Sequence, residues 1–194
     1  MKIDLPRSAL VIIDVQNDFC PGGALEVENG DEVIAPLNLL ASFIAAGGGR
    51  IVATQDWHPK GHISFELWPD HCVQGSKGAH FYESLDLKQV NLIIRKGFRS
   101  NLDSYSAFFE NDRQTSTGLD GYLKSLSIDT VVLGGIATDY CVLYSALDAA
   151  AQGFKTIVLS DAVRGVNKPP GSVERAFEQF KEAGVILTNS REIT

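Results

Sequence analysis

The 194-residue sequence has few of the features that mark secreted, membrane or nucleic-acid-binding proteins. Its three cysteines are an odd number in a chain long enough for a substantial core, so free thiols are expected rather than a disulfide framework. No apolar run approaches the roughly 20 residues that cross a bilayer. The first residues also lack the basic segment followed by an apolar segment that is typical of a signal peptide. Lysine and arginine form no cluster, and the net charge is −7, which disfavours a nucleic-acid partner. We expect a cytoplasmic, soluble protein with a small-molecule partner, no membrane partner, and a single domain over residues 1–194.

Short apolar runs alternate with segments of helical period along most of the chain. Because the runs are apolar throughout, they are typical of strands buried on both faces of a parallel sheet. We therefore predict a three-layer, Rossmann-like α/β/α fold with a six-stranded, mainly parallel sheet. The expected strands are residues 10–13, 50–55, 91–95, 130–133, 155–159 and 185–187, and the expected helices are residues 31–46, 119–126, 141–151 and 172–183, with Ser172 as the cap of the last helix.

Cys141 follows a predicted strand and a turn of two glycines, and it falls in the first turn of an alanine-rich helix. Unpaired N–H groups and the helix dipole there favour a thiolate and can hold an oxyanion. Asp14 and Lys96 directly follow two other strands, and the carboxyl ends of parallel strands share one edge. Singly, these residues have plain structural alternatives: a turn carboxylate, a surface cation and an inert core thiol. Together they supply a nucleophile, a base and a cation, so we predict that they form one catalytic group.

The segment from about residue 56 to residue 90 has little periodicity, and loops of this length inside a domain are usually functional. It contains Asp56, His58, His62 and His71, which include three of the four histidines. An Asp-x-His pair with a more distant histidine suits zinc, iron or manganese, although a hydrogen-bonded pair and a packed His62 are the structural alternative. We predict a single divalent metal ion, with zinc favoured, held in this loop region.

Several aromatic residues fall in predicted loops rather than in strands or helices. They are Phe19, Trp57, Trp68 and Tyr105. Aromatic side chains are mostly core residues, but rings in loops at the carboxyl edge can also line a cleft that stacks on a flat substrate.

Five blocks of the sequence, in this order, resemble the isochorismatase-like cysteine hydrolases, and most closely their nicotinamidase/pyrazinamidase branch. Members without a metal generally lack the Asp-x-His and Trp-Pro-x-His blocks, so the presence of both points to this branch rather than to isochorismatases or carbamoyl-sarcosine amidases. The blocks are residues 13–19 (IDVQNDF) with 21–25 (PGGAL), 56–59 (DWHP) with 62–65 (HISF), 68–75 (WPDHCVQG), 96–97 (KG) with 103–108 (DSYSAF), and 135–142 (GIATDYCV).

The resemblance implies a role for each candidate residue. It implies that Asp14, Lys96 and Cys141 form a triad. It also implies a cis peptide bond between Ile136 and Ala137, which turns the Ala137 N–H toward an oxyanion beside that of Cys141. The implied metal ligands are Asp56, His58 and His71; some members use a further histidine near the position of His62, at a different spacing. The implied neighbours of a pyridine ring are Phe19, Trp68 and Tyr105.

The activity implied by the resemblance is hydrolysis of nicotinamide to nicotinate and ammonia in pyridine-nucleotide salvage, with pyrazinamide as a second substrate. Two alternatives stay open at this point. The same pocket could serve another amide, carbamoyl or vinyl-ether compound, or the protein could bind a ligand without catalysis. The sequence also leaves a homo-oligomer open.

Overall fold

The computed structural model describes all residues, 1–194, and contains the predicted six-stranded sheet. The strands are β1 (Ser8–Ile13), β2 (Arg50–Asp56), β3 (Leu92–Lys96), β4 (Thr130–Ile136), β5 (Lys155–Arg164) and β6 (Ile186–Thr188). Their order across the sheet is β3-β2-β1-β4-β5-β6, and every pair of neighbours is parallel. The predicted sheet is therefore confirmed, and it is parallel throughout.

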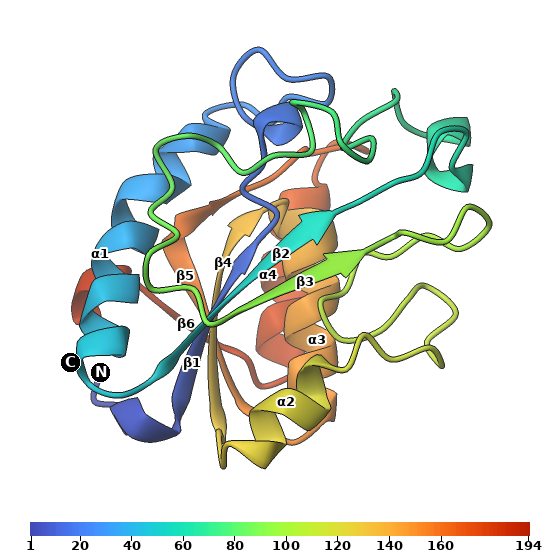
Figure 1. The fold of residues 1–194 in the computed structure, drawn as a ribbon. Coiled ribbons are helices and arrows are strands. Elements are labelled where there is room, and N and C mark those ends of the chain that lie inside the picture. Colours follow the sequence, from blue (N-terminus) through green and yellow to red (C-terminus); the bar gives the residue numbers. More distant parts are fainter.

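Four α-helices cover the two faces of this sheet unequally, as Figure 1 shows. Helix α1 (Ile34–Ala46) lies on one face, and α2 (Leu119–Ser125), α3 (Leu143–Ala151) and α4 (Ser172–Glu182) lie on the other. A hydrophobic cluster of 25 buried residues fills the α1 side, and one of 22 buried residues fills the opposite side. Because both faces of the sheet are covered, the central strands are apolar at nearly every position. The predicted three-layer α/β/α architecture is confirmed.

None of the helices has both the length and the apolar character needed to cross a membrane.

Some element boundaries differ from the prediction. The helix expected at residues 31–46 begins with a 3-10 turn, Gly30–Val33, before α1 starts. β5 continues to Arg164, beyond the expected residue 159, past a register shift in its pairing with β4. The prediction that Ser172 caps α4 is wrong. Gly171 occupies the N-cap position, and the Ser172 hydroxyl donates instead to the carboxylate of Asp139 at 2.5 Å.

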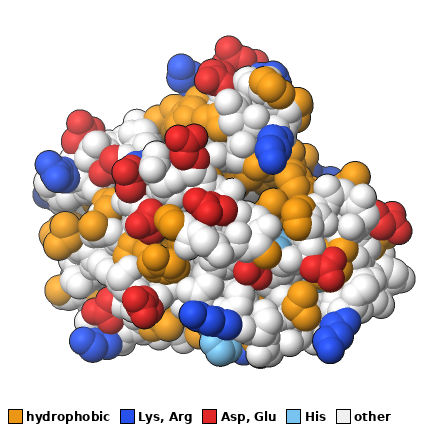
Figure 2. All heavy atoms as spheres, turned by 90° about the horizontal axis from the view of Figure 1, so that it is seen from above, with side chains coloured by type: hydrophobic (Ala, Val, Ile, Leu, Met, Phe, Trp, Pro, Cys, Tyr) orange, Lys and Arg blue, Asp and Glu red, His pale blue; other side chains and the backbone are white.

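The direction of chain progression reverses between β1 and β4, which makes this pair the topological switch point of the sheet. In open parallel sheets, ligands bind outside the carboxyl ends of the strands at such a point. β1 leads into Asp14 and β4 leads toward Cys141, so both residues flank it. Gly135 has a φ of +127°, and a Cβ there would lie 2.1 Å from the Ile13 carbonyl oxygen, so a side chain would force the two strands apart. Figure 2 looks onto this end of the molecule, where hydrophobic side chains gather and charged groups are scattered around them.

Candidate active site

Lys96 is the centre of the site. It is fully buried at the end of β3, and its Nζ lies 2.8 Å from Asp14 Oδ2 and 3.4 Å from Cys141 Sγ. The same ammonium donates to the Ser104 carbonyl oxygen at 3.0 Å and to the Asp56 carboxylate. Burial lowers the pKa of Lys96, but the two carboxylates outweigh this effect and raise the pKa well above its ordinary value. The lysine therefore keeps its charge inside the protein.

Asp14 is held by the neighbouring strand β2. It leaves β1 with a positive φ of +48°, and its backbone N–H donates to Thr54 Oγ1 at 3.1 Å. The Thr54 hydroxyl donates in turn to Asp14 Oδ1 at 2.6 Å, which fixes the carboxylate. Burial raises the pKa of Asp14, although Lys96 opposes the rise. A carboxylate with a raised pKa is a stronger base and suits reversible proton transfer to and from a thiol.

Cys141 lies in a π-helical turn, Thr138–Val142, which precedes α3. The peptide bond between Ile136 and Ala137, just before this turn, is cis. Burial raises the pKa of the Cys141 thiol well above its ordinary value; Lys96 opposes this rise, and the carboxylates of Asp14 and Asp56 add to it. The helix terminus favours a thiolate, but desolvation acts in the opposite direction and dominates the pKa shift of this thiol. The thiol needs a base, and an Asp14 carboxylate oxygen lies within 4.8 Å of Sγ.

Asp56, His58 and His71 converge beside this group. Asp56 Oδ2 lies 3.6 Å from His58 Nε2 and 3.9 Å from His71 Nε2. Each histidine places Nδ1 against a backbone carbonyl oxygen, that of Gly97 at 2.8 Å and that of Pro69 at 2.7 Å. Nδ1 must donate to these oxygens, so Nε2 carries the lone pair and is free to act as a ligand.

Two further observations fit a divalent metal ion at this cluster. His58 Nε2 is buried and has no hydrogen-bond partner in the protein, which leaves its lone pair unsatisfied. Burial opposes ionisation of Asp56, but Lys96 and His58 outweigh it and hold the pKa of this carboxyl well below its usual range. A carboxylate and two imidazole nitrogens within 4.8 Å of one another form a possible metal-binding site.

His62 lies next to this cluster but is engaged elsewhere. Its Nδ1 accepts a hydrogen bond from the Ser64 N–H at 3.2 Å, which caps the short 3-10 helix Ile63–Glu66. Its Nε2 lies 3.2 Å from the Leu102 carbonyl oxygen. The ring stacks on His58, with centroids 4.2 Å apart and an interplanar angle of 18°. Both ring nitrogens have backbone partners, so the structure uses His62 to support His58.

Phe19, Trp68 and Tyr105 line one pocket together with Cys141, whereas Trp57 lies elsewhere, under the guanidinium of Arg95. The Trp68 Nε1–H donates to the Tyr105 hydroxyl at 3.4 Å, so two walls of the pocket are joined. The cavity that the rings leave is about 30 Å³, room for about two water molecules. The other lining residues are Leu25, Asp56, Ser64, His71, Asp103, Ala137, Tyr140 and Val166.

Sequence reasoning missed several residues that build this site. Tyr140 lines the pocket and lies edge-on to Trp68, with ring centroids 5.1 Å apart. Buried Gln16 brackets the backbone of Asp56, since it donates to the Asp56 carbonyl oxygen at 2.9 Å and accepts from the Asp56 N–H at 2.8 Å. Gln16 lies two residues after Asp14, and Thr54 lies two residues before Asp56, so each is close in sequence to a predicted functional aspartate.

Comparisons with known proteins identify the family of this chain. The Isochorismatase domain family matches residues 8–192. A nicotinamidase of Acinetobacter baylyi is 45% identical, over 95% of this chain and 94% of that protein. The crystal structure of PnC1 from L. infantum in complex with nicotinate superposes with a TM-score of 0.93 at 37% identity, covering 100% of this chain and 98% of that one. The pyrazinamidase of Pyrococcus horikoshii in complex with zinc gives 0.85 at 39% identity, covering 95% and 99%. The chain belongs to the isochorismatase family and, within it, to the nicotinamidase/pyrazinamidase branch.

Proposed function

We propose that this protein is a zinc-containing nicotinamidase, which converts nicotinamide and water to nicotinate and ammonia and acts on pyrazinamide in the same way. The observation that carries the proposal is the single pocket in which Cys141, the metal-ligand candidates Asp56 and His71, and the rings of Trp68 and Tyr105 all meet. The aromatic walls suit the faces of a flat heteroaromatic amide, and the Cys141 thiol lines the same pocket. In the cell, we place the reaction in the cytoplasm, in salvage of the pyridine ring.

The proposed reaction uses the triad twice. Asp14 takes the proton of Cys141, and Lys96 stabilises the thiolate that forms. The sulfur attacks the carboxamide carbon, and the N–H groups of Ala137 and Cys141 donate to the resulting oxyanion. Asp14 then gives its proton to the amide nitrogen, the C–N bond breaks, ammonia leaves, and a thioester to Cys141 remains. Asp14 next removes a proton from water, which attacks the thioester, and nicotinate leaves as the thiol is restored.

In this proposal Asp56, His58 and His71 hold the metal ion. Two histidines and one carboxylate are a common zinc ligand set, and the complex of the Pyrococcus relative with zinc supports that choice. When bound, the ion supplies a Lewis-acid contact for the ring nitrogen, and it thereby orients the amide toward the sulfur. The carbonyl groups of Gly97 and Pro69 keep both imidazoles in the tautomer that this task requires.

The test is release of ammonia from a panel of nicotinamide, pyrazinamide, an aliphatic amide and a carbamoyl compound. We expect turnover of the first two and little of the others, because the ring is held by aromatic walls. Cys141→Ala should abolish turnover, since it removes the nucleophile, whereas Cys20→Ala, at a buried thiol outside the pocket, should keep most of it. A Cys141→Ala enzyme with even a tenth of the parent activity would rule out the thioester mechanism. Faster release from the carbamoyl compound would instead indicate a related hydrolase.

A further inference from the structure

The loop that connects β5 to α4, residues 165–171, supplies part of the wall of the catalytic pocket. Val166 lines the pocket together with Cys141, and it packs against the hydrophobic cluster on the α1 side of the sheet. The next four residues, 167–170, are exposed to solvent. Exposed loops are usually more mobile than the elements that they connect. The position of Val166 in the pocket wall therefore depends on the contacts that hold this β5–α4 loop.

Asp139 holds the β5–α4 loop from inside the protein. It lies in the π-helical turn that carries Cys141, here called the nucleophile turn, and it is only 6% exposed. Its Oδ1 accepts a hydrogen bond from the Val166 N–H at 2.9 Å, and its Oδ2 accepts one from the Asn167 N–H at 2.9 Å. The Ser172 hydroxyl, at the start of α4, also donates to Oδ2. Both carboxylate oxygens are therefore engaged by donors of this one connection.

A further hydrogen bond to the loop comes from the next residue of the nucleophile turn. The Tyr140 hydroxyl donates to the Lys168 carbonyl oxygen, while the Tyr140 ring lines the pocket. Apart from hydrogen bonds to α4 and within the loop, residues 166–171 bond only to Asp139 and Tyr140. The nucleophile turn is therefore the part of the protein to which the loop is held.

The nucleophile turn has backbone contacts of its own. The N–H groups of Tyr140 and Val142 both donate to the Ala137 carbonyl oxygen, and the turn continues directly into α3. None of these contacts uses the Asp139 side chain. Loss of the Asp139 carboxylate should therefore release the loop and leave the backbone around Cys141 in place.

We propose that Asp139 is a positioning residue of the reaction, which keeps Val166 in the pocket wall by holding the β5–α4 loop to the nucleophile turn. The inference rests on the proposed nicotinamidase function and adds to it a residue that does not itself line the pocket. A pocket wall contacts the substrate both before and during the reaction. Its loss therefore weakens substrate binding and raises KM, with little effect on kcat.

Asp139→Asn is the principal test variant, because an amide cannot replace this carboxylate. Each carboxylate oxygen accepts from a backbone N–H, whereas an asparagine side chain has a single oxygen. Whichever way the amide is turned, its NH₂ group faces a backbone donor. Tyr140→Phe is a second, milder variant, which keeps the ring and loses only the hydrogen bond to Lys168. It decides whether the loop must be held if Asp139→Asn fails to fold.

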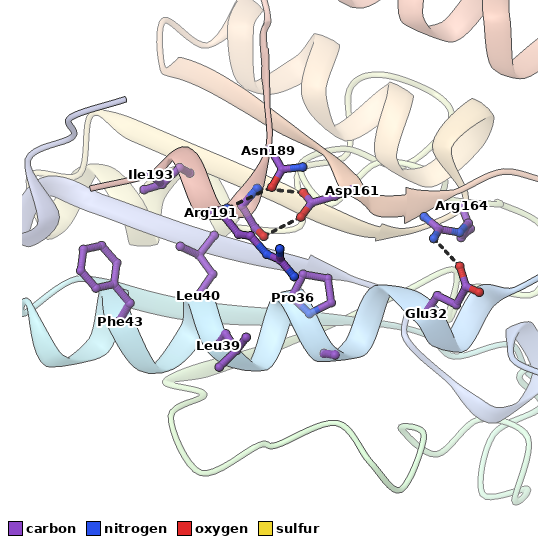
Figure 3. Close-up of a pocket in the computed structure, with 12 residues that line it drawn as sticks. Glu32, Pro36, Leu39, Leu40, Phe43, Asp161, Arg164, Asn189, Arg191 and Ile193 are labelled. Atoms are coloured by element: carbon purple, nitrogen blue, oxygen red, sulfur yellow. Dashed lines mark hydrogen bonds and ion pairs between the residues drawn. The ribbon is translucent and has the colours of Figure 1, made fainter.

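Asp161→Asn is the matched control. The Asp161 carboxylate also holds a neighbouring segment, since Oδ1 accepts from the Ser190 N–H at 2.8 Å and Oδ2 accepts from the Ser190 hydroxyl at 2.6 Å. Figure 3 shows Asp161 in a groove beside α1, and no residue that lines this groove also lines the catalytic pocket. The same chemical change at Asp161 should therefore leave both KM and kcat near those of the parent protein.

Steady-state kinetics of ammonia release from nicotinamide, together with hydrogen exchange of backbone amides, tests the proposal. Asp139→Asn should raise KM by roughly tenfold and keep kcat within about threefold of the parent, and Tyr140→Phe should raise KM by a smaller factor. In Asp139→Asn the amides of Val166 and Asn167 should exchange faster than in the parent, whereas that of Ser190 should not change.

Three results would overturn the proposal while the parent protein turns over nicotinamide. They are an unchanged KM in the variants of Asp139 and Tyr140, a loss of kcat at constant KM in Asp139→Asn, and an equal rise of KM in Asp161→Asn. The second would show that Asp139 acts on the nucleophile rather than on the pocket wall. A parent protein that releases no ammonia from nicotinamide would instead refute the proposed function, and this inference with it.

Discussion

Removal of the Lys96 charge tests the site most directly. Lys96→Met keeps much of the side-chain volume but leaves the carboxylates of Asp14 and Asp56 buried without their shared cation. Loss of one partner of a buried ion pair costs about 3–5 kcal/mol. For a chain of this size each kcal/mol lowers the Tm by roughly 2–4 °C, so we expect a drop of roughly 6–20 °C.

The size of the loss should depend on pH. Burial raises the pKa of Asp14, and Lys96 counteracts that rise, so the folded-state pKa of Asp14 should climb further in the variant. Above the unfolded-state value of about 3.9, the folded variant then binds more protons than the unfolded chain. The contribution of Asp14 to the variant's stability is therefore most favourable at low pH and falls as the pH rises toward the folded-state pKa. The deficit relative to the parent should be larger at about pH 8 than at about pH 5.

Differential scanning calorimetry in the presence of a chelator measures this effect without a contribution from metal binding. The control is the double variant Lys96→Met/Asp14→Asn, in which one of the two uncompensated carboxylates is also removed. We expect the double variant to melt above the single variant, because a neutral amide costs less to bury than a lone carboxylate. A Tm drop below about 3 °C, or a double variant less stable than Lys96→Met alone, would refute the charge argument.

Two further predictions concern the metal ligands, and both use metal analysis of purified protein. Gly97 has a φ of +61°, and a Cβ there would lie 2.5 Å from the His58 ring, so Gly97→Ala should displace that ligand and lower metal content. Gly118→Ala, with a φ of +91° and open space, is the control for backbone strain and should keep its metal; equal metal content in the two variants would contradict the displacement. His62→Ala should also retain most of its metal and His71→Ala should not, because both His62 ring nitrogens already have backbone partners. Equal losses in the two histidine variants would identify His62 as a ligand.

The strand ends could be predicted from the sequence because a parallel sheet covered on both faces imposes a simple pattern. Its strands are apolar until they leave the sheet, so the first polar residues mark the carboxyl edge. Asp14 stands at such a transition. That rule was enough to predict that Asp14, Lys96 and Cys141 lie at one edge of the sheet. In the structure Lys96 contacts both of the other side chains, and a carboxylate oxygen of Asp14 lies within 4.8 Å of Cys141 Sγ.

Long-range contacts account for what the sequence did not predict. The high pKa of Cys141 depends on complete burial and on carboxylates from two other strands, which the local helix terminus does not reveal. The capping role of His62 depends on Ser64 nearby and on Leu102, 40 residues away.

Asp56 shows why the two predicted groups of residues are better understood as one. One carboxylate oxygen of Asp56 accepts a hydrogen bond from Lys96, and the other faces the Nε2 atoms of His58 and His71. The charge that Lys96 presents to Cys141 therefore depends on Asp56, and the position of the oxygen proposed as a metal ligand depends on Lys96. Gln16 hydrogen-bonds to both the N–H and the carbonyl oxygen of Asp56, which fixes the backbone from which this carboxylate extends. Asp56 thus contacts both the Lys96–Cys141 group and the two histidines. This shared contact keeps the thiol and the histidines at a fixed relative position, which an amide bound between them requires.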